Sequence, residues 1–206
     1  MLSGYNITEE GVVHESAGIS KMKYDHTYVN AYNNFKLQTE YMSWLRYGYM
    51  VASIGYTPKS VLDVGYGNGE FLKVCSKTIE KCMGNDVSEY PLPDKCEFVE
   101  IYEKTEVITF FDSLEHFEDI SFVKNLNSKF LIISVPWCHH PDDDEWFSSW
   151  KHRKPGEHLW HFNHVSLVKF MKSNDYSLIN YCNIEDAIRK SVTSLENILT
   201  ASFVRA

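Results

Sequence analysis

The stretch VLDVGYGNG, residues 61–69, decides how the rest of the chain is interpreted. The apolar run that includes its first half predicts a buried β-strand over residues 60–64, although Asp63 lies inside that run. Three glycines then occupy alternate positions, where glycine permits positive φ angles and lets a ligand approach the main chain. A helix predicted to begin at Glu70 would add free backbone N–H groups. The stretch therefore predicts a ligand-binding turn between a strand and a helix.

Composition and charge narrow the class of protein. The chain has 206 residues, of which 44% are hydrophobic and 23% charged, as in a globular protein with one full core. A net charge of −8 disfavours bulk binding to nucleic acid. Five scattered cysteines without C-x-x-C spacing predict reduced thiols in the cytoplasm. No apolar run approaches the ~18 residues of a membrane span, so no membrane contact is expected; the oligomeric state is left open.

Strand and helix signals alternate after the glycine turn, which predicts an α/β fold with a parallel sheet covered on both faces. The intervals around the third strand are too short for crossover helices, so this strand is expected to be short and its helices reduced. The strands are expected at 60–64, 82–87, 96–100, 107–111, 129–135, 176–182 and 198–204, and the helices at 70–81, 113–126 and 165–173.

The chain before the strand pattern is expected to form an N-terminal helical cap, residues 1–57, ahead of a main domain over 58–206. Residues 1–23 show no period and are expected to be extended. Tyrosines then recur at every fourth position, as on one face of a helix, and a helical pattern continues to about Ile54. These tyrosines are Tyr24, Tyr28 and Tyr32.

The spacing of the glycines bears on the kind of ligand. The dinucleotide-binding fingerprint is G-x-G-x-x-G. Here Gly65 and Gly67 are followed by Gly69 one position early, and Glu70 stands where the fingerprint has its third glycine. A carboxylate there would repel a pyrophosphate. A nicotinamide-dependent dehydrogenase is therefore disfavoured and is kept only as a third alternative.

Three motifs in order make the sequence resemble class I S-adenosylmethionine-dependent methyltransferases. They are VLDVGYGNGEF at 61–71, NDVS at 85–88 and FFDSLEHFED at 110–119. The resemblance covers roughly residues 58–180 and points to the branch with a D-x-L-E-H sequence, which includes many enzymes for small molecules. It implies a Rossmann-like sheet, mostly parallel with an antiparallel last strand, and S-adenosyl-L-methionine as the cofactor.

The resemblance also implies roles for individual residues. The glycine turn would line the methionine part of the cofactor, and Asp63 would hold that turn and the amino group. Asp86 would accept hydrogen bonds from the ribose hydroxyls, because a carboxylate offers two acceptors. For each acid the alternative is a structural cap or a solvated turn. The residues expected to bind the cofactor are Asp63, Gly65, Tyr66, Gly67, Gly69, Asp86, Val87, Asp112, Ser113 and Leu114.

Residues 136–164 are rich in histidine and aromatic residues and are expected to form a lid insertion. A general base is needed only if the acceptor carries a proton when it attacks. His158 is the first candidate for such a base and His161 the second; the alternative is that they hold the lid in place. No metal site is expected, because the histidines and aspartates of the lid match no known ligand spacing. The residues expected to contact the substrate are Tyr28, Trp137, Arg153 and Trp160.

We therefore expect a methyltransferase that acts on a small molecule, such as a sugar, a sugar nucleotide or another metabolite, by in-line methyl transfer. The alternative is a non-catalytic module that binds S-adenosylmethionine or a nucleoside and regulates or scaffolds a partner.

Overall fold

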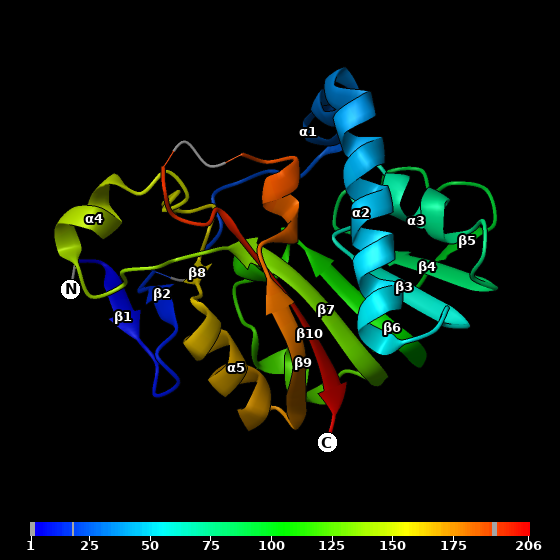
Figure 1. The fold of residues 1–206 in the computed structure, drawn as a ribbon. Helices are drawn as coiled ribbons and strands as arrows, with labels where there is room; N and C mark the ends of the chain where they lie inside the picture. The colour runs from blue at the N-terminus through cyan, green and yellow to red at the C-terminus, as the bar shows by residue number, and fades with distance from the viewer. Residues whose placement is uncertain (1–2, 18, 191–192) are drawn as a thin grey trace.

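The computed structural model describes residues 3–17, 19–190 and 193–206 and contains one large sheet (Figure 1). Its strand order is β5-β4-β3-β6-β7-β10-β9. The first five strands in this order are mutually parallel, and β10 runs antiparallel to both β7 and β9. The predicted Rossmann-like sheet with an antiparallel last strand is thus confirmed. The strands are β3 (Ser60–Val64), β4 (Lys81–Asn85), β5 (Cys96–Phe98), β6 (Thr105–Phe111), β7 (Ser128–Pro136), β9 (Tyr176–Cys182) and β10 (Ile198–Arg205).

Apolar side chains on both faces of the sheet explain why its central strands are nearly continuous hydrophobic runs. Successive residues of a strand point to opposite faces. Leu62 and Ile108 accordingly belong to one buried cluster, and their neighbours Val61 and Val107 belong to another. The first cluster is covered by α5 and the second by α2 and α3. These helices are α2 (Lys36–Ile54), α3 (Glu70–Cys75) and α5 (His164–Ser173).

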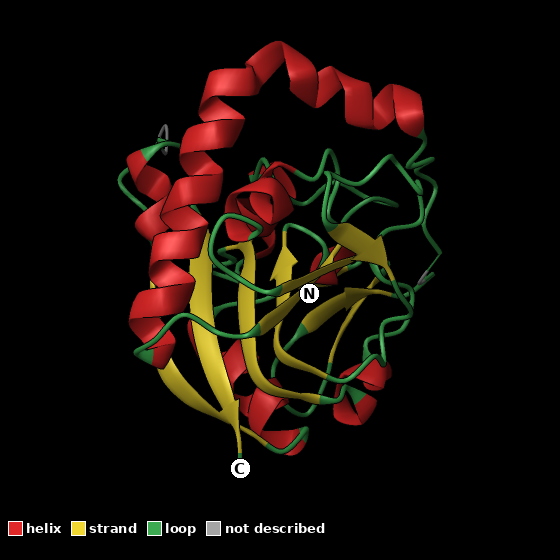
Figure 2. Cartoon of the chain, turned by 90° about the vertical axis from the view of Figure 1, so that its right-hand side faces the viewer, coloured by secondary structure: helices red, strands yellow, loops and turns green. Residues whose placement is uncertain are grey.

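The helical segment at the N-terminus is interrupted once. It consists of α1 (His26–Ala31), a 3₁₀ turn η1 (Tyr32–Phe35) and α2. In Figure 2, α2 runs beside the sheet and the chain before it bends across the end of the sheet. Tyr24 precedes α1, and the side chain of Tyr32 lies outside the described residues. No helix among the described residues has the length and apolar character needed to cross a bilayer.

A second, small sheet was not anticipated from the sequence. Two short strands of the N-terminal segment form an antiparallel hairpin, and the second of them pairs with a strand from the 136–164 segment. Val13, Cys138 and Phe147 form a separate buried cluster beneath it. This segment also contains a short helix and so has a small core of its own. The elements are β1 (Tyr5–Ile7), β2 (Val13–Glu15), β8 (Trp160–His161) and α4 (Asp144–Ser149).

The helix predicted over 113–126 was wrong. The structure has two 3₁₀ turns there, η2 (Leu114–His116) and η3 (Ser121–Asn125). A 3₁₀-helix has three residues per turn, so side chains three apart share one face. The apolar residues of this stretch follow that period and are buried: Ile120, Val123 and Leu126.

The reduced structure around the third strand is confirmed. β5 has three residues, and no helix connects it to β4 or β6 in this described part of the chain. The helix after the glycine turn is also shorter than predicted, since α3 ends at Cys75 and turns lead from it to β4.

Candidate active site

A cavity of about 750 Å³ lies at the carboxyl ends of β3, β4 and β6. β4 and β6 lie on opposite sides of β3, so the cavity sits where the winding of the sheet reverses, the usual ligand position in such folds. Residues of the N-terminal segment, α1 and α2 form the opposite wall. Of the residues predicted to bind the cofactor, these line the cavity: Asp63, Gly65, Tyr66, Gly67, Asp86, Val87, Asp112 and Ser113.

The glycine turn is held in a conformation that requires glycine. Gly65, Gly67 and Gly69 have φ angles of 81°, 54° and 74°. A Cβ atom on Gly65 would lie 2.5 Å from the Cβ of Ser113, whereas one on Gly67 would meet no atom within 4 Å. Ser113 is fixed in this position because its hydroxyl donates a hydrogen bond to the main-chain oxygen of Val64 at 2.6 Å. The first glycine therefore allows the residues that follow β3 and β6 to approach each other, and the second leaves its Cα face open.

Asp86 connects the ends of β3 and β4. Its Oδ2 accepts a hydrogen bond from the main-chain N–H of Gly67 at 2.9 Å, and its Oδ1 accepts one from the N–H of Ser88 at 2.8 Å. Each carboxylate oxygen has a second lone pair. Asp86 can therefore fix the glycine turn and still accept hydrogen bonds from a ligand.

Asp63 is a buried acid on the cavity wall. Its side chain accepts a hydrogen bond from the hydroxyl of Thr109 at 2.6 Å. Burial raises the pKa of Asp63 to about 7, against the opposing effects of Thr109 and Arg46, while Asp86 raises it further. Near neutral pH this carboxyl thus gains a negative charge readily if a cationic group binds beside it.

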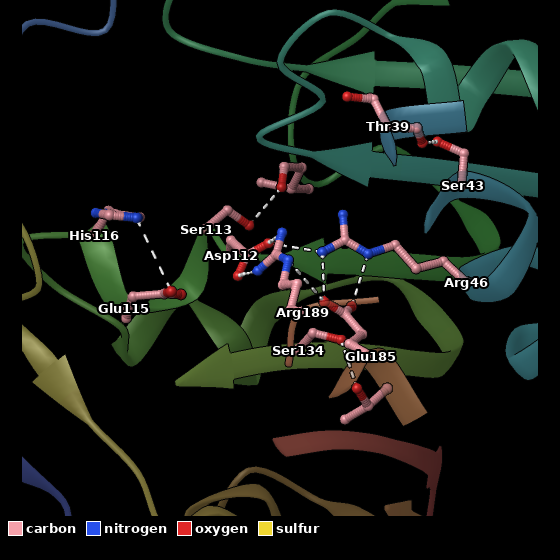
Figure 3. A network of polar contacts seen from close by, with 12 residues as sticks. Thr39, Ser43, Arg46, Asp112, Ser113, Glu115, His116, Ser134, Glu185 and Arg189 are labelled. Atoms are coloured by element: carbon pink, nitrogen blue, oxygen red, sulfur yellow. Dashed lines mark hydrogen bonds and ion pairs between the residues drawn. The ribbon is translucent and has the colours of Figure 1, made fainter. Parts of the chain in front are cut away.

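Asp112 is the centre of an ion-pair network that the sequence did not reveal (Figure 3). Arg46 donates to Asp112 at 2.7 Å, and Arg189 donates two hydrogen bonds to it at 2.6 Å each. Arg46 also donates to the fully buried Glu185 at 2.7 and 3.0 Å. Burial alone would raise the pKa of Asp112, but the two arginines outweigh it and hold that pKa well below its usual range.

This network connects three elements at the cavity. Arg46 comes from α2, Asp112 follows β6, and Glu185 lies in the 3₁₀ turn η4 (Ile184–Ala187). Asp112 has a φ of 54°, an uncommon conformation for a residue other than glycine. The signal for Arg46 was present in the sequence, because Thr39, Ser43 and Arg46 are spaced as one polar face of a helix, and all three line the cavity.

Aromatic rings form much of the remaining wall. Tyr28, predicted to contact the substrate, lines the cavity together with Tyr24, and their rings meet edge to face at 5.2 Å. The guanidinium of Arg46 lies 4.5 Å from the centre of the Phe111 ring. This wall can hold a flat or apolar ligand next to the charged network.

The structure places neither of the two predicted base histidines on the described cavity wall. His158 and His161 are 5% and 2% exposed, and neither belongs to the described cavity wall. Burial lowers the pKa of each to about 3. His161 packs against Tyr5 and Phe147 of the small second core. These positions support the alternative interpretation, in which both histidines hold the segment together.

Other predicted site residues also lie outside the described cavity wall. Leu114 is in the main core, and Gly69 is the N-cap residue of α3. Trp160 donates its indole N–H to a main-chain oxygen at 2.8 Å, and Trp137 stacks on His139 at 5.1 Å. Arg153 lies 6.0 Å from the ring of Tyr5. The predicted strand ends do line the cavity, but the sequence could not tell that no residue of the 136–164 segment belongs to the described cavity wall.

His116 is the histidine that does line the cavity. Its Nδ1 donates a hydrogen bond to the main-chain oxygen of Glu157 at 2.8 Å and lies 2.9 Å from the hydroxyl of Tyr24. Burial lowers the pKa of His116, so the ring is neutral near pH 7. It was visible in the sequence only as the last residue of the D-x-L-E-H motif.

Comparison with known proteins identifies the family of this chain. A family model described as a methyltransferase domain matches residues 39–181. This range contains all three motifs of the cavity wall. None of the curated proteins matches the chain.

Several solved structures share the fold at low sequence identity. A 1,6-didemethyltoxoflavin-N1-methyltransferase from Burkholderia thailandensis has 12% identity and a TM-score of 0.62, with 99% of this chain and 100% of that chain covered. The magnesium protoporphyrin IX methyltransferase of Synechocystis PCC 6803 has 17% identity and a TM-score of 0.57, covering 82% and 84%. A plantazolicin methyltransferase has 16% identity and a TM-score of 0.57, covering 85% and 88%.

Proposed function

This chain belongs to a family of methyltransferase domains, and we propose that it transfers a methyl group from S-adenosyl-L-methionine to a small molecule. One observation carries the proposal: three motifs far apart in the sequence meet at one cavity, at the carboxyl ends of three adjacent parallel strands. The cavity volume lies within the usual range of small-molecule sites. The five cysteines of the chain form no disulfide, which supports a reducing compartment, and we propose the cytoplasm.

The cofactor would bind along the strand ends. The open Cα face of Gly67 suits the methionine part, and Asp86 suits the ribose hydroxyls through its remaining lone pairs. Asp63 lies beside this turn, and an ammonium group there would favour its charged form. The solved relatives from Synechocystis and Burkholderia thailandensis contain S-adenosylhomocysteine, which supports a cofactor of this kind.

The acceptor would occupy the part of the cavity formed by α1 and α2. The wall there includes Tyr24, Tyr28, Met42 and His116. In-line methyl transfer mainly requires that the acceptor atom and the methyl group be aligned. Rigid aromatic walls and the fixed ion-pair network can provide that alignment. The acceptors named for the solved relatives differ from one another, so we propose only that the acceptor is a small molecule.

Transfer of a labelled methyl group tests this proposal. The protein would be incubated with S-adenosylmethionine that carries a deuterated methyl group and with a small-molecule extract, followed by mass spectrometry. We expect at least one small molecule to gain the labelled methyl group only when the protein is present. The Asp94→Ala variant, with an exposed aspartate removed outside the described cavity wall, is the matched control for Asp86→Ala.

The outcomes distinguish a methyltransferase from a non-catalytic module that binds the same cofactor. Labelled product with wild-type protein and Asp94→Ala, but much less with Asp86→Ala, supports the enzyme. Tight binding of S-adenosylmethionine without any labelled small molecule would favour the non-catalytic binding module instead.

A further inference from the structure

Three potential metal ligands converge next to the cavity. Glu115 and His116 belong to η2, and His158 precedes β8, far along the chain. One ligand atom of each side chain lies within 4.8 Å of the other two. His116 also lines the cavity, whereas Glu115 and His158 are buried behind it. The fold thus brings a carboxylate and two imidazoles together at one point.

The state of Glu115 is the strongest sign that something is bound there. Its side chain is 1% exposed, and neither carboxylate oxygen has a hydrogen-bond partner among the described residues. The closest ionisable contact is His116, whose Nε2 lies 4.0 Å from Oε1 (Figure 3). Burial of an unpaired carboxylate is costly, and buried charges are ordinarily paired or bound to metal ions. A cation between these side chains would remove that cost.

Both histidines are oriented as metal-binding histidines usually are. The Nδ1 of His158 donates a hydrogen bond to the main-chain oxygen of His152 at 2.7 Å. The Nδ1 of His116 donates to the main-chain oxygen of Glu157 at 2.8 Å. In a neutral ring this leaves the lone pair on Nε2. A backbone carbonyl that accepts from one ring nitrogen is the typical support for metal binding through the other.

The charged groups next to the cluster are paired with one another. The carboxylate of Glu157 lies 3.8 Å from the Nε2 of His158 and pairs with Lys154 at 2.8 Å. Asp112 is engaged by Arg46 and Arg189, so it is not available as a further ligand.

We propose that Glu115, His116 and His158 bind one divalent first-row transition-metal ion, of which Zn²⁺ and Co²⁺ are examples. Two imidazoles and one carboxylate suit such ions better than Mg²⁺ or Ca²⁺, which prefer oxygen ligands. Metal–ligand bonds of about 2.0–2.2 Å place tetrahedral ligand atoms roughly 3.4 Å apart. The three side chains would therefore close in by about an ångström when the ion binds. The inference stands independently of the proposed methyltransferase function.

Titration with Co²⁺ tests the site without any assay of activity. The protein would be stripped with a chelator, dialysed and titrated while the visible d–d absorption of Co²⁺ is recorded. We expect one strongly bound Co²⁺ per chain, which Zn²⁺ displaces and Mg²⁺ does not. Zn²⁺ should also raise the melting temperature, because an ion that binds only the folded protein stabilises it.

Variants separate this site from adventitious binding by other histidines. Glu115→Gln and His158→Gln should each lower the Co²⁺ affinity at least ~10-fold, the minimum expected even for loss of a supporting group. Glu115→Gln replaces an unpartnered side chain by a neutral one of the same shape, so its melting temperature without metal should not fall. His161→Gln changes an equally buried histidine outside the cluster, and His140→Gln changes one in the loop before α4. Both should keep the Co²⁺ band.

The proposal would be overturned by the absence of a d–d band, or by a band that persists in both Glu115→Gln and His158→Gln. A Zn²⁺-induced stabilisation that is equal in wild-type protein and Glu115→Gln would also contradict it. Binding of S-adenosylhomocysteine by the stripped protein would be measured in parallel, so a failure of the metal site is distinguishable from a failure of the cofactor site.

Discussion

At the scale of single residues, the glycine turn is fixed by contacts that differ from one glycine to the next. Gly65 faces Ser113 so closely that no side chain fits, whereas Gly67 faces open space. Both have positive φ angles, so the backbone conformation favours glycine at both positions. The sequence predicted the requirement for glycine at both positions but not this difference, which depends on the neighbouring strand.

We therefore expect Gly65→Ala to be much more destabilising than Gly67→Ala. The second change adds only the cost of a left-handed conformation, about 1–2 kcal/mol. The first adds a clash between Cβ atoms and should lower the free energy of unfolding by roughly 3–5 kcal/mol. Urea denaturation of the two variants measures the difference. Equal losses at the two positions would show that Gly65 and Ser113 are not in the contact described.

Asp63 gives a prediction about pH. An unfolded aspartate titrates near pH 3.9, and burial raises the pKa of Asp63 in the folded protein to about 7. Between these values the folded protein binds more protons than the unfolded protein, so the contribution of Asp63 to stability falls as pH rises from about 4 to about 7. In Asp63→Asn this loss is absent.

The stability of Asp63→Asn relative to wild type should thus improve by more than about 1 kcal/mol between pH 5 and pH 7.5. Chemical denaturation at both pH values measures it. The comparison with wild type cancels the contributions of the buried histidines, which titrate near pH 6.5 in the unfolded protein. A difference that stays constant with pH would mean that Asp63 is ionised throughout.

At the scale of elements, the ion-pair network determines how α2 and η4 sit at the end of the sheet. Most strands and helices were predictable because the hydrophobic period of each element can be seen in consecutive residues. The pairing of β2 with β8 was not, since two or three residues per strand give no period and the partners are far apart in the sequence. The contact between Arg46 and Glu185 was not predictable either, because the two residues are far apart in the sequence and no local pattern connects them.

Removal of Arg46 should be costly. Arg46→Met removes a positively charged partner from the fully buried carboxylate of Glu185. Breaking one side of a buried ion pair typically costs about 3–5 kcal/mol. Lys73→Met is the matched control, because Lys73 pairs with Glu70 on the surface, where such pairs contribute about 0–1 kcal/mol. Urea denaturation should separate the two variants clearly.

The double variant Arg46→Met with Glu185→Met provides a check, because it removes the uncompensated charge. Part of the lost stability should return in it. If Arg46→Met is as stable as Lys73→Met, the network does not hold the helix in the way described.

At the scale of the whole molecule, the class of the sheet and the position of its cavity followed from the sequence. Apolar runs gave the strands, and the motifs at 61–71, 85–88 and 110–119 gave the strand ends that meet. The placement of the 136–164 segment did not follow, because its histidines and tryptophans suit either a lid or a small core. The structure shows that its Trp137, His158 and His161 are buried.

Isothermal titration calorimetry with S-adenosylhomocysteine measures whether the strand ends around Asp86 bind the cofactor. We predict that wild-type protein and Asp94→Ala bind it equally, that Asp86→Ala binds it at least about tenfold more weakly, a loss of about 1.4 kcal/mol, and that NADH does not bind. The absence of binding heat at millimolar S-adenosylhomocysteine, or binding by Asp86→Ala as tight as by the wild type, would contradict a cofactor site at these strand ends.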